Sequence, residues 1–155
     1  MNKTALSIGL ELIFWIVTAI IAAAVLYPII SVTEDYRFLV PNIIFIVVLV
    51  TCTRYIFLLR HTWLAKLQVV KTALIFGSIW AIFLLIEQLS KFQSFIDEEG
   101  PEALVGDLPL DQMASIVGYI KSEMMFFGVG SIIAVLVLAG RLMKSIWNYK
   151  NLGVA

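Results

Sequence analysis

Four long stretches of the chain are predominantly apolar, and short polar or charged segments separate them. The stretches run from about 6 to 30, 38 to 59, 69 to 97 and 109 to 148. Each can cross roughly 30 Å of hydrocarbon as an α-helix, which takes about 20 residues. The pattern therefore predicts an all-α polytopic membrane protein. We expect one domain, residues 1–155, with four transmembrane helices in an antiparallel bundle.

The third and fourth stretches are longer than a bilayer requires, and their ends keep apolar residues at helical spacing. Two such stripes predict that segments three and four continue outside the membrane and pack together as a helical hairpin. The alternative places residues 110–121 flat on the membrane surface, with a bend at Gly118. The expected hairpin contacts are Leu89, Phe92, Ile96, Met113, Ile116 and Ile120.

The connections complete this arrangement. The short link between residues 62 and 68 predicts that segments two and three form an antiparallel hairpin. An acidic loop, residues 97–108, joins segments three and four, and Gly100 and Pro101 break the helix there. Asp107 has the side chain of a helix N-cap for segment four. We expect this loop to be solvated, as charged runs usually are.

Composition narrows the function classes. Hydrophobic residues make up 61% of the chain, against about 45–50% in soluble domains. Outside the four apolar stretches, the sequence has no basic stripe with interleaved aromatic residues, so nucleic acid is not an expected partner. Cys52 and His61 are each the only residue of their type, so an internal disulfide or a paired-histidine haem or metal site cannot form. Without a hydrolase or phosphate-loop motif, we expect a protein that is not an enzyme and has no cofactor or metal.

Basic residues predict the orientation, because lysine and arginine near segment ends favour the cytoplasmic side. With the N-terminus inside, eight of the eleven basic residues lie inside, and Glu11 is the only acidic residue there. We therefore expect a plasma or inner membrane protein with cytoplasmic termini and residues 91–123 outside. The inside set is Lys3, Arg54, Arg60, Lys66, Lys71, Arg141, Lys144 and Lys150, and the outside set is Arg37, Lys91 and Lys121.

Ionisable residues inside membrane segments are costly, which makes each a candidate for function. Glu11 and Arg54 lie at similar depth near the inner ends of segments one and two, so we expect them to pair as a brace. Arg141 is the alternative partner of Glu11. Lys71 is shallower, and we expect its side chain to extend to the interface.

Glu87 lies near the outer end of segment three. It either reaches the interface or sits between helices beside Gln88 or Lys91. Asn42 and Tyr27 are at comparable depth and are candidate hydrogen-bond partners, because polar side chains often join membrane helices.

Small residues concentrate in segment four and allow close helix packing. Internal packing and dimerisation both account for them. The set is Gly128, Gly130, Ser131, Ala134, Ala139 and Gly140, with Gly77 and Ser78 in segment three.

The expected function is a non-enzymatic subunit or partner-binding module of a membrane assembly. It would use the hairpin or the small-residue face toward a membrane-protein partner or a second copy of the chain, within the lipid bilayer. The alternative is a small transporter or channel component with a polar path through Glu11, Arg54 and Glu87. A continuous polar cavity between the levels of Glu11 and Glu87 would favour transport.

The orientation leads to a labelling prediction. Single cysteines are placed between residues 91 and 123, or at Lys66, in a chain lacking Cys52. We expect an impermeant thiol reagent to label the first set in intact cells and to spare position 66. The opposite pattern would reverse the topology.

Overall fold

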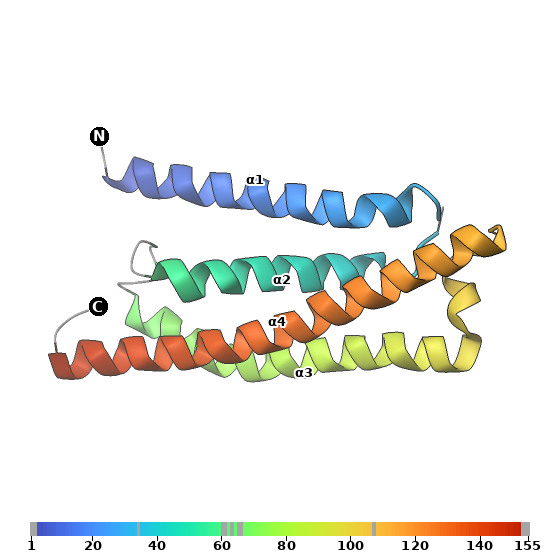
Figure 1. Ribbon diagram of the computed structural model, residues 1–155. Helices are drawn as coiled ribbons and strands as arrows, with labels where there is room; N and C mark the ends of the chain where they lie inside the picture. Colours follow the sequence, from blue (N-terminus) through green and yellow to red (C-terminus); the bar gives the residue numbers. More distant parts are fainter. Residues whose placement is uncertain are drawn as a thin grey trace.

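The computed structural model describes residues 3–33, 35–59, 62, 64, 67–106 and 108–152, with only the backbone of 3–8 and 152. It holds four long helices: α1 (Lys3–Ile30), α2 (Leu39–Leu58), α3 (Gln68–Glu99) and α4 (Leu110–Leu152). A short 3₁₀ helix, η3 (Pro101–Leu104), lies between α3 and α4 (Figure 1). These described residues contain no β-strand.

All four long helices are long and apolar enough to cross a membrane, which confirms the predicted all-α fold class. They alternate in direction, so the start of α1 and the end of α4 lie at one end of the bundle (Figure 1). We call this the terminal end. The opposite end, where η3 joins α3 to α4, is the hairpin end. The observed helix bounds differ from the predicted segments by only a few residues.

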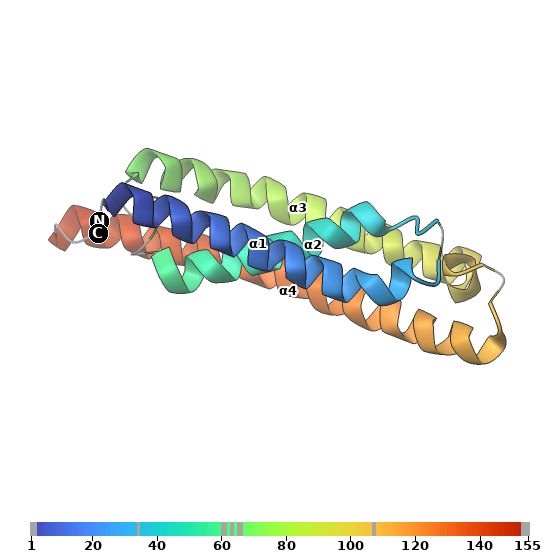
Figure 2. The same ribbon diagram turned by 90° about the horizontal axis from the view of Figure 1, so that it is seen from above.

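Helix α4 is the centre of the bundle, because it packs extensively on both α2 and α3. Helix α1 packs chiefly on α2 and touches α4 less. Seen from above, α2 crosses the bundle obliquely, with its first residues toward α3 and its last toward α4 (Figure 2). Helices α2 and α3 make few direct contacts, so segments two and three do not pack on each other as the predicted hairpin implied. The two helices are antiparallel, but they meet mainly through α4.

Two glycines let α4 approach its neighbours closely. A Cβ on Gly128 would lie 2.8 Å from Leu89 Cδ1 on α3 and 3.5 Å from a ring carbon of Phe45 on α2. A Cβ on Gly130 would lie 3.3 Å from Leu49 Cδ2. Internal packing therefore accounts for these small residues, as it does for the buried Ser131, Ala134 and Ala139. At Gly77 and Gly140 an added Cβ would meet no atom within 4 Å.

The predicted hairpin is present. Helices α3 and α4 project past the ends of α1 and α2 (Figure 1), and all six predicted contact residues belong to one hydrophobic cluster. Leu89, Phe92 and Ile120 are buried in this cluster, and the other three pack at its edge. Helix α4 has no break at Gly118. The alternative of a separate surface-lying helix is therefore wrong.

The acidic loop is more ordered than expected. Gly100, at φ 85°, ends α3, and Gly106 adopts φ 66°; both values favour glycine. Between them, η3 brings Leu104 and Val105 into the core at 4% and 6% exposure. The described acidic side chains of the loop stay exposed, as expected; these are Asp97, Glu98, Glu99 and Glu102. The proposed N-cap Asp107 lies outside the described residues.

The close approach at Gly128 leads to a prediction. Gly128→Val should destabilise the bundle by about 1–3 kcal/mol, because overpacking a tight contact forces neighbours apart. Gly140→Val is the matched control, with the same change in an open position of the same helix. The free energy of unfolding in detergent measures the difference. Equal effects of the two substitutions would show that the contact with Leu89 adapts without cost.

Candidate functional site

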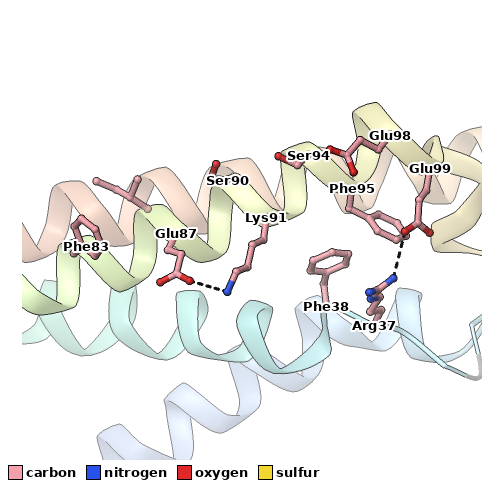
Figure 3. A pocket seen from close by; sticks show the side chains of 11 residues that line it. Arg37, Phe38, Phe83, Glu87, Ser90, Lys91, Ser94, Phe95, Glu98 and Glu99 are labelled. Carbon is pink, nitrogen blue, oxygen red and sulfur yellow. Dashed lines mark ion pairs between the residues drawn. The ribbon is translucent and has the colours of Figure 1, made fainter.

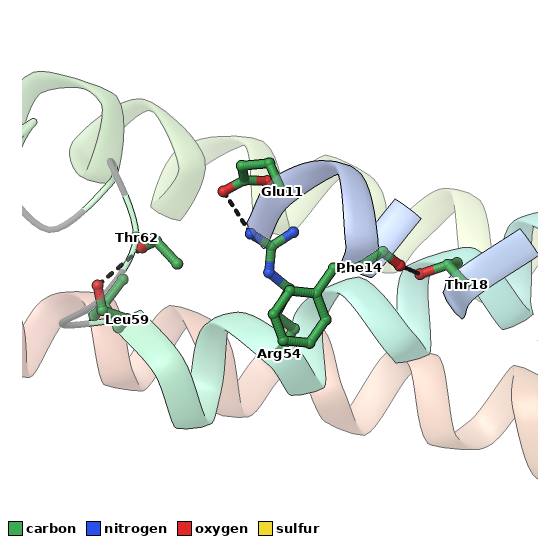
Figure 4. A network of polar contacts seen from close by, with 6 residues as sticks. All are labelled: Glu11, Phe14, Thr18, Arg54, Leu59 and Thr62. Carbon is green, nitrogen blue, oxygen red and sulfur yellow. Dashed lines mark hydrogen bonds and ion pairs between the residues drawn. The ribbon is translucent and has the colours of Figure 1, made fainter. Parts of the chain in front are cut away.

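The predicted brace between Glu11 and Arg54 is present. An Arg54 guanidinium nitrogen on α2 forms an ion pair with Glu11 Oε1 on α1, near the terminal end (Figure 4). The side chains of Arg54 and Glu11 are 8% and 25% exposed. The pair is therefore largely withdrawn from solvent, where an ion pair is less screened than at a surface.

Aromatic rings complete the surroundings of Arg54. Its guanidinium carbon lies 4.5 Å from the centroid of Phe14 and 5.2 Å from that of Tyr55. A guanidinium over a ring face is attracted by the negative face of the π system. The charge is thus held by one carboxylate and two rings, which is an arrangement that joins helices.

Arg141, the alternative partner of Glu11, is exposed on α4 and forms no ion pair with a described residue. Lys71 differs from its prediction. Its side chain is fully buried instead of extending to the interface, and Nζ donates a hydrogen bond of 2.9 Å to Ser145 Oγ on α4. This bond joins α3 to α4 near the terminal end.

Glu87 is exposed near the hairpin end and pairs with Lys91 one turn away, at 2.7 Å. It reaches a polar surface, which was one of its two predicted positions. Neither Asn42 nor Tyr27 bonds to it: Asn42 is buried against α4, and Tyr27 is 73% exposed. Solvent-exposed pairs of this kind contribute about 0.2–1 kcal/mol.

A pocket of about 580 Å³ surrounds Glu87 and Lys91, where α3 passes the residues that precede α2 (Figure 3). We call it the interfacial pocket. Arg37 lies across it, 3.6 Å from Glu99 and 5.2 Å from the centroid of Phe95. Its lining also includes Phe38, Phe83, Ile86, Ser90, Ser94 and Glu98. Charged, hydroxyl and aromatic groups therefore meet in one open site.

A second hollow, of about 320 Å³, lies between α3 and α4 on the hairpin. We call it the hairpin groove. Phe92, Ile96 and Met125 supply apolar surface, and Asp97 and Lys121 supply one charge of each sign. Gln93 also lines it and contacts the Met125 sulfur at 3.7 Å. An apolar groove flanked by both charges suits a protein segment better than a small ion.

One buried carboxyl was missed as a site by sequence reasoning. Glu123, on α4, is 6% exposed and accepts a hydrogen bond at Oε1 from the Asn42 side-chain nitrogen on α2. Glu123 Oε2, Asn42 Oδ1 and the Tyr36 hydroxyl have no hydrogen-bond partner among the described residues. Burial, and then the nearby Glu123 charge, raise the pKa of the Tyr36 phenol.

The signal for Glu123 was present in the sequence. Glu123 follows Ile120 by three residues and precedes Phe127 by four, so helical spacing places it on the stripe that faces the core. The asymmetry of basic residues places Glu123 only within the outside stretch, residues 91–123, and assigns it no position on the helix. Helical position, and not charge, decides where this side chain lies.

The candidate ionisable residues Glu11, Arg54 and Glu87 lie at two separate levels of the bundle. Glu11 and Arg54 join α1 to α2 near the terminal end, whereas Glu87 lines the interfacial pocket near the hairpin end. Glu11 lines neither the interfacial pocket nor the hairpin groove. Within the described residues, no group of three or more His, Cys, Asp or Glu side chains could hold a metal ion.

The brace leads to a double-mutant prediction. Glu11→Gln and Arg54→Gln should be coupled by about 0.5–2 kcal/mol in the free energy of unfolding, because each removes the same contact. The cycle of Glu11→Gln with Arg141→Gln is the control and should be additive. Additivity in both cycles would show that the pair does not stabilise the bundle.

The buried contact between Asn42 and Glu123 leads to a second prediction about stability. Glu123→Leu should cost about 1–3 kcal/mol, because the Asn42 amide loses its buried acceptor. The double substitution with Asn42→Leu should be less destabilised than Glu123→Leu alone, because no polar partner is left unpaired. Thermal unfolding in detergent compares the two. A double variant that is worse than the single one would contradict this explanation.

The comparisons with known proteins give no family for the chain. No family model matches it, and neither does any curated protein or solved structure. Its function must therefore be argued from its own residues.

Proposed function

We propose that the protein is a non-enzymatic subunit or partner-binding module of a membrane assembly, and that the hairpin formed by α3 and α4 contacts the partner. The observation that carries the proposal is the hairpin groove, which lies between α3 and α4 beside the level where α1 ends and α2 begins. Its residues come from α3 and α4, which pack on each other and both contact η3. Such an element presents a groove with little ordering on binding, which favours affinity.

The groove also suggests what the partner presents. Phe92, Ile96 and Met125 would receive an apolar side chain, whereas Asp97 and Lys121 would select complementary charges beside it. A buried apolar anchor with a charged rim is the usual anatomy of a protein interface. The partner is thus a protein with an exposed segment at this level, either another membrane protein or a second copy of the chain.

The small-residue face is less suited to this role. Gly128 and Gly130 already contact α3 and α2, and Ser131 and Ala134 are buried within the bundle. Among the small residues of α4, Gly140 stays open. We therefore place the partner on the hairpin instead of the intramembrane surface of α4.

The transport alternative has less support. Its path would have to connect Glu11 and Arg54 with Glu87, and these groups lie at separate levels and engage separate partners. The buried aromatic and aliphatic core, including Phe45 and Ile46, also runs through α2 between these levels.

We further propose a plasma or inner membrane, with cytoplasmic termini and the hairpin outside. The support is the asymmetry of basic residues in the sequence. In this orientation the hairpin groove opens to the side opposite the termini.

Site-directed photo-crosslinking in intact cells tests the proposal. A photoreactive phenylalanine analogue at Gln93 or Lys121 should give a discrete adduct of the same mass, since both residues line the groove. The control positions are Lys144 and Tyr149, which are exposed on α4 near the terminal end. Asp97→Lys should reduce the adduct from Gln93 several-fold.

The adduct mass distinguishes the partners. A value of twice the 17.4 kDa chain identifies a second copy, and any other single value identifies a different protein. Equal adducts from the groove and control positions, or none from either groove position, would rule out a partner at the hairpin.

A further inference from the structure

We propose that the interfacial pocket binds the headgroup of a phospholipid that carries a primary ammonium, such as phosphatidylethanolamine. This is independent of the proposed protein partner, which uses the hairpin groove on the face between α3 and α4. The inference rests on the depth of the pocket, its charges and the apolar surface beside it.

The pocket lies where the apolar part of α3 ends. From Val69 to Ile86, Lys71 is the only charged residue, and this stretch rises roughly 27 Å at about 1.5 Å per residue. That rise is close to the roughly 30 Å of a hydrocarbon core. Glu87 is the next residue, and across the pocket Arg37 comes just before the apolar α2. Both sides of the pocket thus reach the level of lipid headgroups.

The charges match a zwitterion. Arg37 and Lys91 supply two positive charges, and Glu87, Glu98 and Glu99 supply three negative ones, so the lining carries one net negative charge. A phosphate can bind between the cations, and an ammonium can bind to the carboxylates. The net negative charge disfavours a lipid whose headgroup has no ammonium.

These groups are free to exchange partners. The Arg37 and Lys91 side chains are 69% and 59% exposed, and ion pairs that solvent reaches are weak. Among the described residues, Glu98 forms no ion pair, so its carboxylate remains available. A primary ammonium offers three hydrogen-bond donors, whereas the quaternary ammonium of a choline lipid offers none. The carboxylates therefore favour the primary amine.

Aromatic and hydroxyl side chains form the walls of the pocket. Phe38 packs edge-on against Phe92 and Phe95, with ring centroids 5.3 and 5.1 Å apart. Arg37 lies over Phe95, and Figure 3 shows its guanidinium directed to Glu99. Ser90 and Ser94 add hydroxyl groups that can bond to phosphate or ester oxygens. The volume of about 580 Å³ is within the usual range of ligand pockets.

An acyl chain has a surface to follow from the pocket. Phe76, Trp80 and Phe83 are about 70%, 70% and 68% exposed. They share one face of α3 with Glu87, at spacings of three and four residues. Phe83 belongs to both the pocket and this strip. A lipid whose headgroup fills the pocket could therefore lay its chain along α3.

Native mass spectrometry of the full chain in detergent tests the proposal. The probes are phosphatidylethanolamine, phosphatidylcholine and phosphatidylglycerol, each with the same acyl chains. We expect at least about fivefold more one-to-one adduct with phosphatidylethanolamine than with either of the others. Equal binding of phosphatidylcholine would overturn recognition of a primary ammonium. Stronger binding of phosphatidylglycerol, or no retained lipid, would overturn the site.

Two matched double variants test whether the lipid binds in the interfacial pocket. Glu87→Gln combined with Glu98→Gln should abolish the preference, and Glu102→Gln combined with Asp111→Gln should preserve it. All four carboxylates are exposed, and the second pair lies outside the pocket, so both variants should melt like the parent protein. An unchanged preference in the pocket variant would overturn the assignment.

A competition experiment separates a membrane lipid from a soluble amino phosphate. Glycerophosphoethanolamine carries the same headgroup without acyl chains, so it should not displace the bound lipid at equal concentration. Displacement would show that the pocket takes a soluble ligand and would overturn the lipid assignment. A photoreactive phosphatidylethanolamine added to membranes should also label the segment between residues 83 and 99.

Discussion

The close contact of α4 with both α2 and α3 is the constraint on which the rest of the bundle depends. Gly128 and Gly130 remove the side chains that would hold these helices apart, and Leu89 and Leu49 occupy the space. In lipid, apolar burial provides little drive for helices to associate, so close packing and hydrogen bonds must supply it. Helices α2 and α3 scarcely touch each other, and without α4 they would have no common core.

Polar contacts reinforce this packing at several levels. Near the terminal end, Lys71 bonds to Ser145 between α3 and α4. Nearer the hairpin end, Asn42 bonds to Glu123 between α2 and α4. The Tyr119 hydroxyl donates to the Val25 carbonyl oxygen at 2.8 Å and joins α4 to α1. Three of the four helices are therefore each tied to α4 by a polar group.

The sequence predicts the elements well because their signals are local. Apolar length defines the four helices, and the stripes through Phe92 and Ile116 define the hairpin. The pairing of Glu11 with Arg54 followed from equal depth, which helix rise alone can estimate. The order in which helices pack could not be predicted this way. A short link suggested that α2 and α3 are partners, but each of them packs mainly on α4.

Among the polar residues and the loops, too, local sequence signals predict some features and only the folded chain decides others. Lys71 was expected to extend to the interface and Glu123 was assigned only to the outer side, whereas their positions on the helices direct both inward. The interfacial pocket combines residues near 37 with residues near 90, so only the folded chain brings them together. The burial of Leu104 and Val105 was not predicted, because they lie in an acidic loop. Two glycines with positive φ allow the chain to turn these side chains toward the core.

The central position of α4 has a consequence for biogenesis. Helix α4 follows α1, α2 and α3 in the chain, so it is synthesised after all three. Before α4 enters, α1 and α2 can already pair through Glu11 and Arg54, but α2 and α3 still lack the helix on which both pack most extensively. The contacts of Lys71 and Asn42 with α4 form only when this helix enters. Assembly of the bundle thus waits for α4, and a chain that stops before it would lack the helix on which α2 and α3 both pack.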